Sequence, residues 1–152
     1  MKKFILVLMC LIFSVQTAFA EKLVLKITPI QEISTKNDEV EVEDWIRFKT
    51  VNDVFYNNKL YIKKGAIVIG IVNSVHENGL IADNAQIDFS EFKVKDVNNK
   101  LVTIKYPLVL NRKNSVCYNF ADKVKKYFGV AFMGNEIYIK PETTTYNLIF
   151  NK

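Results

Sequence analysis

Short segments rich in Val, Ile, Tyr, Phe and Thr recur along the chain from residue 21 onward, and Asn and Gly pairs separate them. This pattern is typical of β-strands joined by tight turns, because β-branched and aromatic side chains suit a pleated sheet, while Asn and Gly accept a positive φ. Four turns are predicted, at Asn57 and Asn58, Asn78 and Gly79, Asn98 and Asn99, and Gly134 and Asn135. We therefore expect an all-β, mostly antiparallel fold, either a small β-barrel or a β-sandwich, with residues 21–152 in a single domain.

Asn78 and Gly79 predict a two-residue type I′ hairpin turn, in which Glu77 pairs with Leu80. Counting outward from this turn gives one face with the pairs Val72–Ala85, Gly70–Ile87 and Val68–Phe89. That face is largely apolar, so we expect it to point into the core, with Gly70 marking a bend or a close approach. The opposite face is mixed, since it carries the pairs Ile69–Asp88 and Ile71–Gln86.

The turn at Asn98 and Asn99 allows two registers of the next hairpin. A two-residue loop places Phe92 opposite Lys105, which mixes apolar and charged side chains on one face. A three-residue loop at residues 98–100 keeps one face apolar, with the pairs Phe92–Tyr106 and Val94–Ile104. We expect this loop with a bulge, although it places Lys93 opposite Lys105. Pro107 is expected to end its strand or to lie at a sheet edge.

The segments before these hairpins predict a strand at residues 22–28, a loop at 34–39 and an extended segment at 40–51. In the last of these, regular alternation places Trp45, Arg47 and Lys49 on one side and Asp44, Ile46, Phe48 and Thr50 on the other. Neither side is uniform in character, so we expect a bulge.

One short helix is predicted near residues 120–128. Ala121, Val124 and Phe128 have helical spacing, and Gly129 is a suitable helix end. Residues 130–150 then predict two strands, separated by Pro141 and a run of threonines.

Residues 1–20 have the pattern of a secretory signal peptide. Lys2 and Lys3 precede an apolar stretch at residues 4–13, and Ala18-Phe19-Ala20 forms a small-x-small cleavage site. We expect cleavage before Glu21. A retained membrane anchor is the alternative, but polar residues interrupt the stretch before it reaches the roughly 20 residues that a spanning helix needs. A lipoprotein is disfavoured, because Cys10 lies in the middle of the apolar stretch without a small residue before it.

Charge and cysteine content narrow the possible classes of protein further. The formal net charge is +5, and cleavage would remove two lysines and leave Cys117 as the single cysteine, which excludes an internal disulfide. Lysines are scattered among acidic residues except at Lys123, Lys125 and Lys126, so we expect no nucleic-acid partner. After cleavage, no apolar stretch reaches membrane-spanning length.

Candidate chemistry is sparse. His76 lies beside Glu77 and could bind a metal with Asp83, but a site needs about four ligands, so a half-buried strand end is the preferred interpretation. Cys117 has no histidine nearby to activate it, so we expect it to pack like a small hydrophobic residue, with a mixed disulfide as the alternative.

Acidic residues recur at Glu39, Glu41, Glu43 and Asp44, without the spacing of a calcium loop. Their alternation with valine predicts the solvated face of a strand. The chain has no G-x-S-x-G motif and no Gly-rich phosphate loop. We therefore assign no catalytic, cofactor-binding or metal-ligating residue.

Aromatic residues are plentiful. Core packing accounts for most of them, and an exposed row would suit a sugar chain or a protein partner. The candidates are Tyr56, Tyr61, Tyr106, Tyr118, Tyr127, Tyr138 and Tyr146, together with Phe89 and Phe92.

Residues 54–72, which read VFYNNKLYIKKGAIVIGIV, resemble a turn-and-strand pattern of bacterial cell-envelope proteins. The conjugal-transfer TrbI-like family carries a related stretch within its β-barrel. Asn98-Asn99-Lys100 stands where such proteins have an Asp-Gly-Lys-like turn, and residues 134–141 resemble the end that closes the barrel. The resemblance implies a β-barrel fold, and we take from it the fold and not the secretion function.

The expected function is that of an exported, non-enzymatic β-barrel protein of the bacterial cell envelope, periplasmic or secreted, that binds a protein or cell-wall partner without a cofactor. Two alternatives stay open, an envelope hydrolase with a site of scattered Asp, Glu and Tyr, and a carbohydrate-binding module. A deep pocket with converging carboxylates would favour the hydrolase, and coplanar exposed aromatic side chains the carbohydrate module. A flat apolar patch with a polar rim would favour a protein partner.

Overall fold

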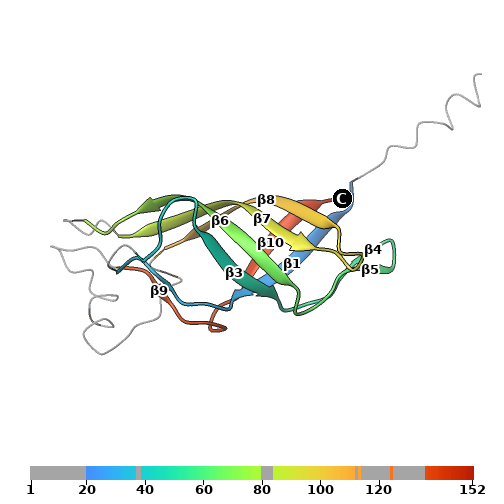
Figure 1. Cartoon of the computed structure of the whole chain (residues 1–152), viewed down its shortest axis with the longest axis horizontal. Helices are drawn as coiled ribbons and strands as arrows, with labels where there is room; N and C mark the ends of the chain where they lie inside the picture. The colour runs from blue at the N-terminus through green and yellow to red at the C-terminus, as the bar shows by residue number, and fades with distance from the viewer. Residues whose placement is uncertain (1–19, 37–38, 80–83, 112, 114–123, 125–135) are drawn as a thin grey trace, which may run out of the picture.

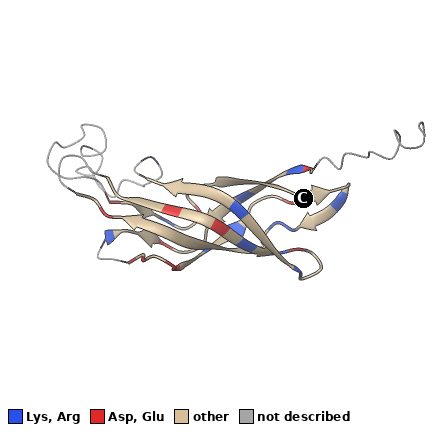
Figure 2. Cartoon of the chain, turned by 90° about the horizontal axis from the view of Figure 1, so that it is seen from above, with Lys and Arg blue, Asp and Glu red and all other residues tan. Residues whose placement is uncertain are grey.

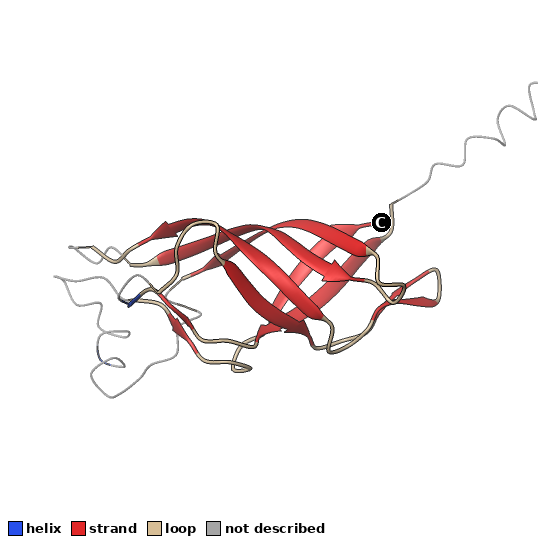
Figure 3. Ribbon diagram, viewed as in Figure 1, coloured by secondary structure: helices blue, strands red, loops and turns tan. Residues whose placement is uncertain are grey.

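The computed structural model describes residues 20–36, 39–79, 84–111, 113, 124 and 136–152. Strands account for nearly all of the regular structure in these residues (Figure 3), which confirms the all-β prediction. The predicted signal peptide up to residue 19, the turn at Gly134 and Asn135, and all of the predicted helix near residues 120–128 except Val124 lie outside the described residues. Among the described residues, no helix is long and apolar enough to cross a membrane.

Six antiparallel strands form one strongly curved sheet in the order β10-β1-β3-β6-β7-β8. Its end strands β8 and β10 lie next to each other, so the sheet nearly closes into a barrel (Figure 1). This favours the barrel over the sandwich among the two predicted architectures. The strands are β1 (Lys22–Pro29), β3 (Trp45–Thr50), β6 (Ile67–His76), β7 (Gln86–Lys95), β8 (Leu101–Leu110) and β10 (Tyr146–Asn151).

Two small ladders complete the structure. β2 (Ile33–Ser34) pairs with β9 (Tyr138–Ile139), and β4 (Val54–Tyr56) pairs with β5 (Lys59–Ile62). The β4–β5 hairpin turns at Asn57 and Asn58, as predicted, and their φ values of 50° and 58° are those of a type I′ turn. The predicted loop at residues 34–39 is wrong at its start, because Ser34 belongs to β2.

Alternation along the strands builds the core. In β3, Ile46, Phe48 and Thr50 are buried, whereas Trp45 and Arg47 are exposed, as the regular alternation predicts. The bulge expected in this segment is absent from β3, because its pairing with β6 runs without a register shift. The inward-facing apolar residues of the six strands are Leu23, Leu25, Ile27, Ile46, Phe48, Val68, Val72, Ile87, Phe89, Phe92, Val94, Ile104, Leu110, Tyr146 and Leu148.

Gly70 allows three phenylalanine rings to meet inside the barrel. The ring centroids of Phe48, Phe89 and Phe92 lie 5.7–5.9 Å apart, within the range that aromatic pairs prefer. A Cβ atom on Gly70 would lie 2.8 Å from Phe92 Cε1 and 3.0 Å from both Phe48 Cε2 and Phe89 Cδ1. The close approach predicted at Gly70 is therefore confirmed, and its cause is the packing of these rings.

The register of β6 against β7 differs from the prediction. β6 ends at His76, which pairs with Gln86, so the two-residue turn at Asn78 and Gly79 is wrong. Val72 lies opposite Phe89 instead of Ala85, and two register shifts occur around Val72. The physical reason lies in β7, whose buried residues have odd numbers before Ser90 (Ile87 and Phe89) and even numbers after it (Phe92 and Val94). A bulge adds one residue to a strand, so the apolar side chains before and after Ser90 can all face the core.

The β7–β8 hairpin has a three-residue loop, as predicted, but one residue earlier. The backbone N–H of Asp96 donates to the carbonyl of Lys100 at 2.9 Å, and Asn99 has a φ of 61°. Asp96 Oδ1 accepts hydrogen bonds from the backbone N–H groups of Asn98 and Lys100, which fixes this turn. The predicted pairs are replaced by Phe92–Ile104, Val94–Val102 and Lys93–Thr103.

The observed register keeps the apolar face, because a shift by two residues does not exchange the faces of a strand. It also removes the expected repulsion, since Lys105 lies opposite Glu91 and not opposite Lys93. Pro107 lies in β8, the last strand of the hydrogen-bonded order, at a register shift, which confirms the predicted edge position.

Candidate functional site

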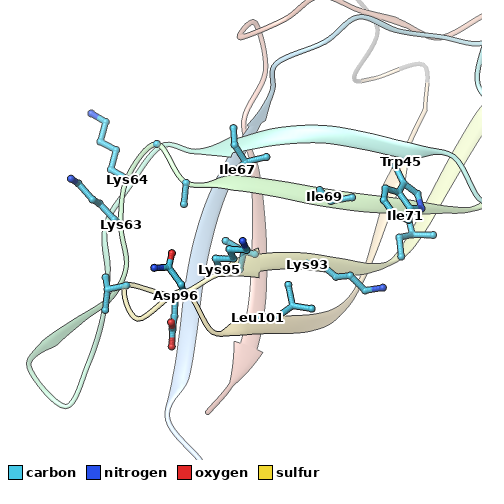
Figure 4. A pocket seen from close by; sticks show the side chains of 15 residues that line it. Trp45, Lys63, Lys64, Ile67, Ile69, Ile71, Lys93, Lys95, Asp96 and Leu101 are labelled. Carbon is cyan, nitrogen blue, oxygen red and sulfur yellow. The ribbon is translucent and has the colours of Figure 1, made fainter.

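A groove with a volume of about 820 Å³ lies on the outer face of the barrel. It runs from the turn after β5 along β6 and β7 to the start of β8 (Figure 4). Its floor is a row of three isoleucines, Ile67, Ile69 and Ile71, on β6. They point outward because the residues between them, Val68 and Gly70, are buried in the core.

Cross-strand neighbours extend this apolar row. Trp45 on β3 pairs with Ile71 on β6 and lies at one end of the groove (Figure 4). Leu101 on β8 lies beyond β7, opposite Lys95. Trp45 is 68% exposed, Leu101 57% and Ile67 50%. Neighbouring apolar side chains with such high exposure form an apolar patch that no described residue covers. These exposed and partly exposed side chains form the apolar groove, which consists of Trp45, Ile67, Ile69, Ile71 and Leu101.

Four lysines border the apolar groove. Lys63 and Lys64 lie at the end opposite Trp45, and Lys93 and Lys95 lie beside the isoleucines on β7 (Figure 4). Lys93 Nζ is 3.2 Å from Glu91 Oε1, whereas Lys63, Lys64 and Lys95 form no ion pair with any residue that the structure describes.

The turn that carries Lys63 and Lys64 is held by Thr50, which is 1% exposed. Its hydroxyl donates to the carbonyl of Lys63 at 2.8 Å and accepts from the backbone N–H of Ala66 at 3.0 Å. The backbone N–H of Gly65, which has a φ of 84°, donates to the carbonyl of Thr50. The lysine end of the groove is thus a fixed turn.

Acidic groups are scarce in the groove. Asp96 is the carboxylate that lines it, and one of its oxygens already accepts two backbone hydrogen bonds in the β7–β8 turn. General acid–base catalysis of glycoside hydrolysis needs two facing carboxyl groups, and the lining does not supply them. The floor of the groove is apolar and its border is cationic. Figure 2 shows that Lys and Arg positions are interspersed with Asp and Glu positions over the described part of the ribbon.

The histidine and cysteine candidates do not come together. His76 is the last residue of β6, as expected of a strand end, but it is exposed and not half-buried. Asp83 and Cys117 lie outside the described residues. Within the part of the chain that the structure describes, no three His, Cys, Asp or Glu residues are placed to hold a metal ion.

The acidic segment around Glu43 forms a turn, so the predicted strand face is wrong for it. Asp44 Oδ2 accepts a hydrogen bond from the backbone N–H of Glu41 at 2.8 Å, and Glu43 has a φ of 71°. Strand β3 begins only at Trp45. The side chains of Glu39, Glu41 and Glu43 are nonetheless exposed, as predicted.

The described tyrosines do not form an exposed row. Tyr146 is buried, and Tyr56 and Tyr61 contact each other across β4 and β5 with ring centroids 6.2 Å apart. Lys152 Nζ lies 3.3 Å from the Tyr61 ring centroid, a cation–π contact that covers this pair. Other predicted aromatic candidates are either partly buried (Tyr106 and Tyr138), in the core (Phe89 and Phe92) or outside the described residues (Tyr118 and Tyr127).

Sequence reasoning missed the apolar groove. The available signal was that residues 66–72 are apolar at both odd and even positions, although a barrel strand needs only one apolar face.

Comparison of the chain with protein-family models, with curated proteins and with solved structures found no significant match. The TrbI-like resemblance therefore has no support beyond the residues that carry it. The site has to be interpreted from its own geometry.

Proposed function

We propose that this protein is an exported, non-enzymatic β-barrel module of the bacterial cell envelope that binds a partner through the apolar groove. Export rests on the signal-peptide pattern of residues 1–20. The observation that carries the binding role is the exposed apolar row with its lysine border. Of the partners considered, a protein fits better than a cell-wall glycan, because the groove contains one aromatic side chain, Trp45, and not a coplanar set.

Affinity capture tests the binding role. The mature protein, residues 21–152, is crosslinked to its own envelope fraction and recovered, and retention on purified cell-wall material is measured in parallel. We expect a specific co-purifying protein. Ile67→Asp combined with Leu101→Asp should abolish its recovery, because two carboxylates would disrupt the apolar surface that the partner covers.

Phe55→Asp is the matched control, because Phe55 is 56% exposed on β4 but does not line the groove. It should leave recovery unchanged. Equal recovery with the groove variant and the wild type would contradict the binding role of the groove, and retention on cell-wall material alone would replace the protein partner by a wall component.

Export is tested separately by fractionating cells that express the full chain. We expect the protein outside the cytoplasm with Glu21 as its first residue. An unprocessed chain in the cytosolic fraction would contradict the export proposal.

A further inference from the structure

We infer that the occupant of the apolar groove is an amphipathic α-helix of a partner protein, with acidic residues flanking its apolar stripe. This inference rests on the proposed binding function and specifies the partner's chemistry. Three observations carry it, namely the saturated hydrogen bonding of β6, the dimensions of the isoleucine row and the placement of the lysines.

Along the isoleucine row, the backbone of β6 is paired with a neighbouring strand on both sides. Residues 67–71 pair with β3 on one side, and residues 68–76 pair with β7 on the other. A peptide lying over this face cannot add a strand to the ladder, so it must satisfy its own backbone N–H and C=O groups. An α-helix does so internally, whereas an extended peptide does not.

The dimensions of the row fit a helix. Ile67 and Ile71 are four residues apart along a strand, a span of about 13 Å. A helix covers that span in about nine residues, which places apolar side chains at positions i, i+4 and i+7 or i+8 over the three isoleucines. The strands on either side of β6 are about 10 Å apart, close to the diameter of a helix.

Cations lie on both sides of the row and at one end of it. Lys93 and Lys95 stand on β7, while Arg47 and Lys49 stand on β3, where Arg47 bonds Gln31 and Lys49 pairs with Glu142. Acidic side chains on the two borders of a helix's apolar stripe would meet these cations. A second copy of this chain would bring the same cations together, so it is disfavoured as the occupant.

The charges also give the helix a direction. Lys63 and Lys64 stand at the Ile67 end of the row, where they suit the partial negative charge of a helix C-terminus. At the other end, Glu91 is the cross-strand neighbour of Ile71 and its carboxylate is paired with Lys93, so the unpaired positive charge is concentrated at the lysine turn. The helix therefore runs from the Trp45 end towards the lysine turn.

Trp45 provides the readout, because it is the only tryptophan of the chain and lines the groove. The probes are three synthetic peptides of about 16 residues without tryptophan, long enough to form a helix. The first has a helical leucine stripe flanked by Glu, the second has Lys in place of Glu, and the third has the first peptide's composition with leucine at alternate positions.

The first peptide should shift Trp45 emission to the blue and bind at least about tenfold more tightly than the second or the third. Raising the salt concentration should weaken its binding, because the flanking charge pairs are exposed. Lys63→Glu combined with Lys64→Glu should weaken it by about tenfold or more without changing the emission of the free protein, because these residues lie far from Trp45.

Equal binding of the first and second peptides would overturn the acidic character of the partner, and tighter binding of the third would overturn the helix.

A blue shift with anionic lipid vesicles and with none of the peptides would also overturn the inference in favour of a membrane surface. So would a concentration-dependent shift of the protein alone, which would indicate a second copy. If none of the peptides binds while affinity capture still depends on Ile67 and Leu101, the helix inference fails and the proposed function stands.

Discussion

The two faces of strand β6 are both apolar, yet their surroundings differ completely. Val68, Gly70 and Val72 face inward and are closed off by the three phenylalanine rings. Ile67, Ile69 and Ile71 face outward into a groove with a lysine border, and no described residue covers them fully. Apolar side chains therefore stabilise the fold on the inner face, while on the outer face they leave an apolar surface in contact with solvent.

This difference distinguishes residues that stabilise the core from residues that are exposed for binding, although both sets have the same apolar composition. Substitutions on the inner face should change the free energy of unfolding, because they alter close-packed contacts. Substitutions on the outer face should change binding and leave the fold intact. Each of the following variants tests one side of this distinction.

Phe48→Ala should have the largest effect on stability. The Phe48 side chain is 0% exposed and packs edge-on against both Phe89 and Phe92, so its removal leaves a cavity in the centre of the barrel. We expect a loss of about 3–5 kcal/mol in the free energy of unfolding, measured by urea denaturation. Trp45→Ala, on the outer face of the same strand, should change it by less than about 0.5 kcal/mol. Similar losses for both variants would contradict the distinction.

Gly70→Ala should cost about 1–3 kcal/mol, because the new methyl group would overlap the three rings. Gly65→Ala is the informative comparison, since no atom beyond its chain neighbours lies within 4 Å of its Cβ position and only its φ of 84° opposes a side chain. We expect it to cost about 1–2 kcal/mol. Asn accepts a positive φ, so Gly65→Asn should recover part of that loss, whereas Gly70→Asn should be worse than Gly70→Ala. Recovery at Gly70 would contradict the steric explanation.

Much of the barrel could be predicted from its alternation. The buried positions of β3 follow directly from the pattern Ile46, Phe48, Thr50, and the turn at Asn57 and Asn58 follows from the tolerance of Asn for positive φ. These features depend on residues close together in the sequence. The all-β architecture could be predicted because apolar and polar residues alternate along nearly every strand.

The register of β6 and the groove could not be predicted in the same way. The face of Ile69 and Ile71 is mixed, as predicted, but its polar partners are Lys93 and Glu91 and not Asp88 and Gln86. The register shifts near Val72 that produce these pairs depend on packing between strands. The apolar stretch at residues 66–72 indicated a second apolar face, but only the register of the folded sheet places Trp45 and Leu101 beside it.

Val68→Thr and Ile67→Thr compare the two faces at adjacent positions. Thr keeps β-branching in both cases, so strand propensity changes little. Val68 is 0% exposed, and a buried hydroxyl there should cost about 1–3 kcal/mol of unfolding free energy. Ile67→Thr should cost less than about 0.5 kcal/mol while weakening the partner's binding. Urea denaturation and affinity capture of both variants measure the two effects, and a partner that is lost only with Val68→Thr would contradict the outer-face role.

Tyr146 should give a small effect on stability, one part of which appears only at alkaline pH. Its ring belongs to the inner face of β10, and burial raises the pKa of its hydroxyl above the usual 10.0, against the opposing effect of a 3.0 Å hydrogen bond with Thr144 Oγ1. Because the folded state holds this proton more tightly than the unfolded state, the stabilisation is complete below about pH 10 and falls as the pH rises further. Tyr146→Phe should lose the hydrogen bond at neutral pH, at a cost of about 1 kcal/mol, and should show a shallower decline in stability above pH 10 than the wild type. Urea denaturation at pH 7 measures the loss of the hydrogen bond, and denaturation at several pH values above 10 measures the effect of ionisation. Parallel declines for the two proteins would show that the pKa of Tyr146 is the same in the folded and unfolded states, which would contradict the effect of burial.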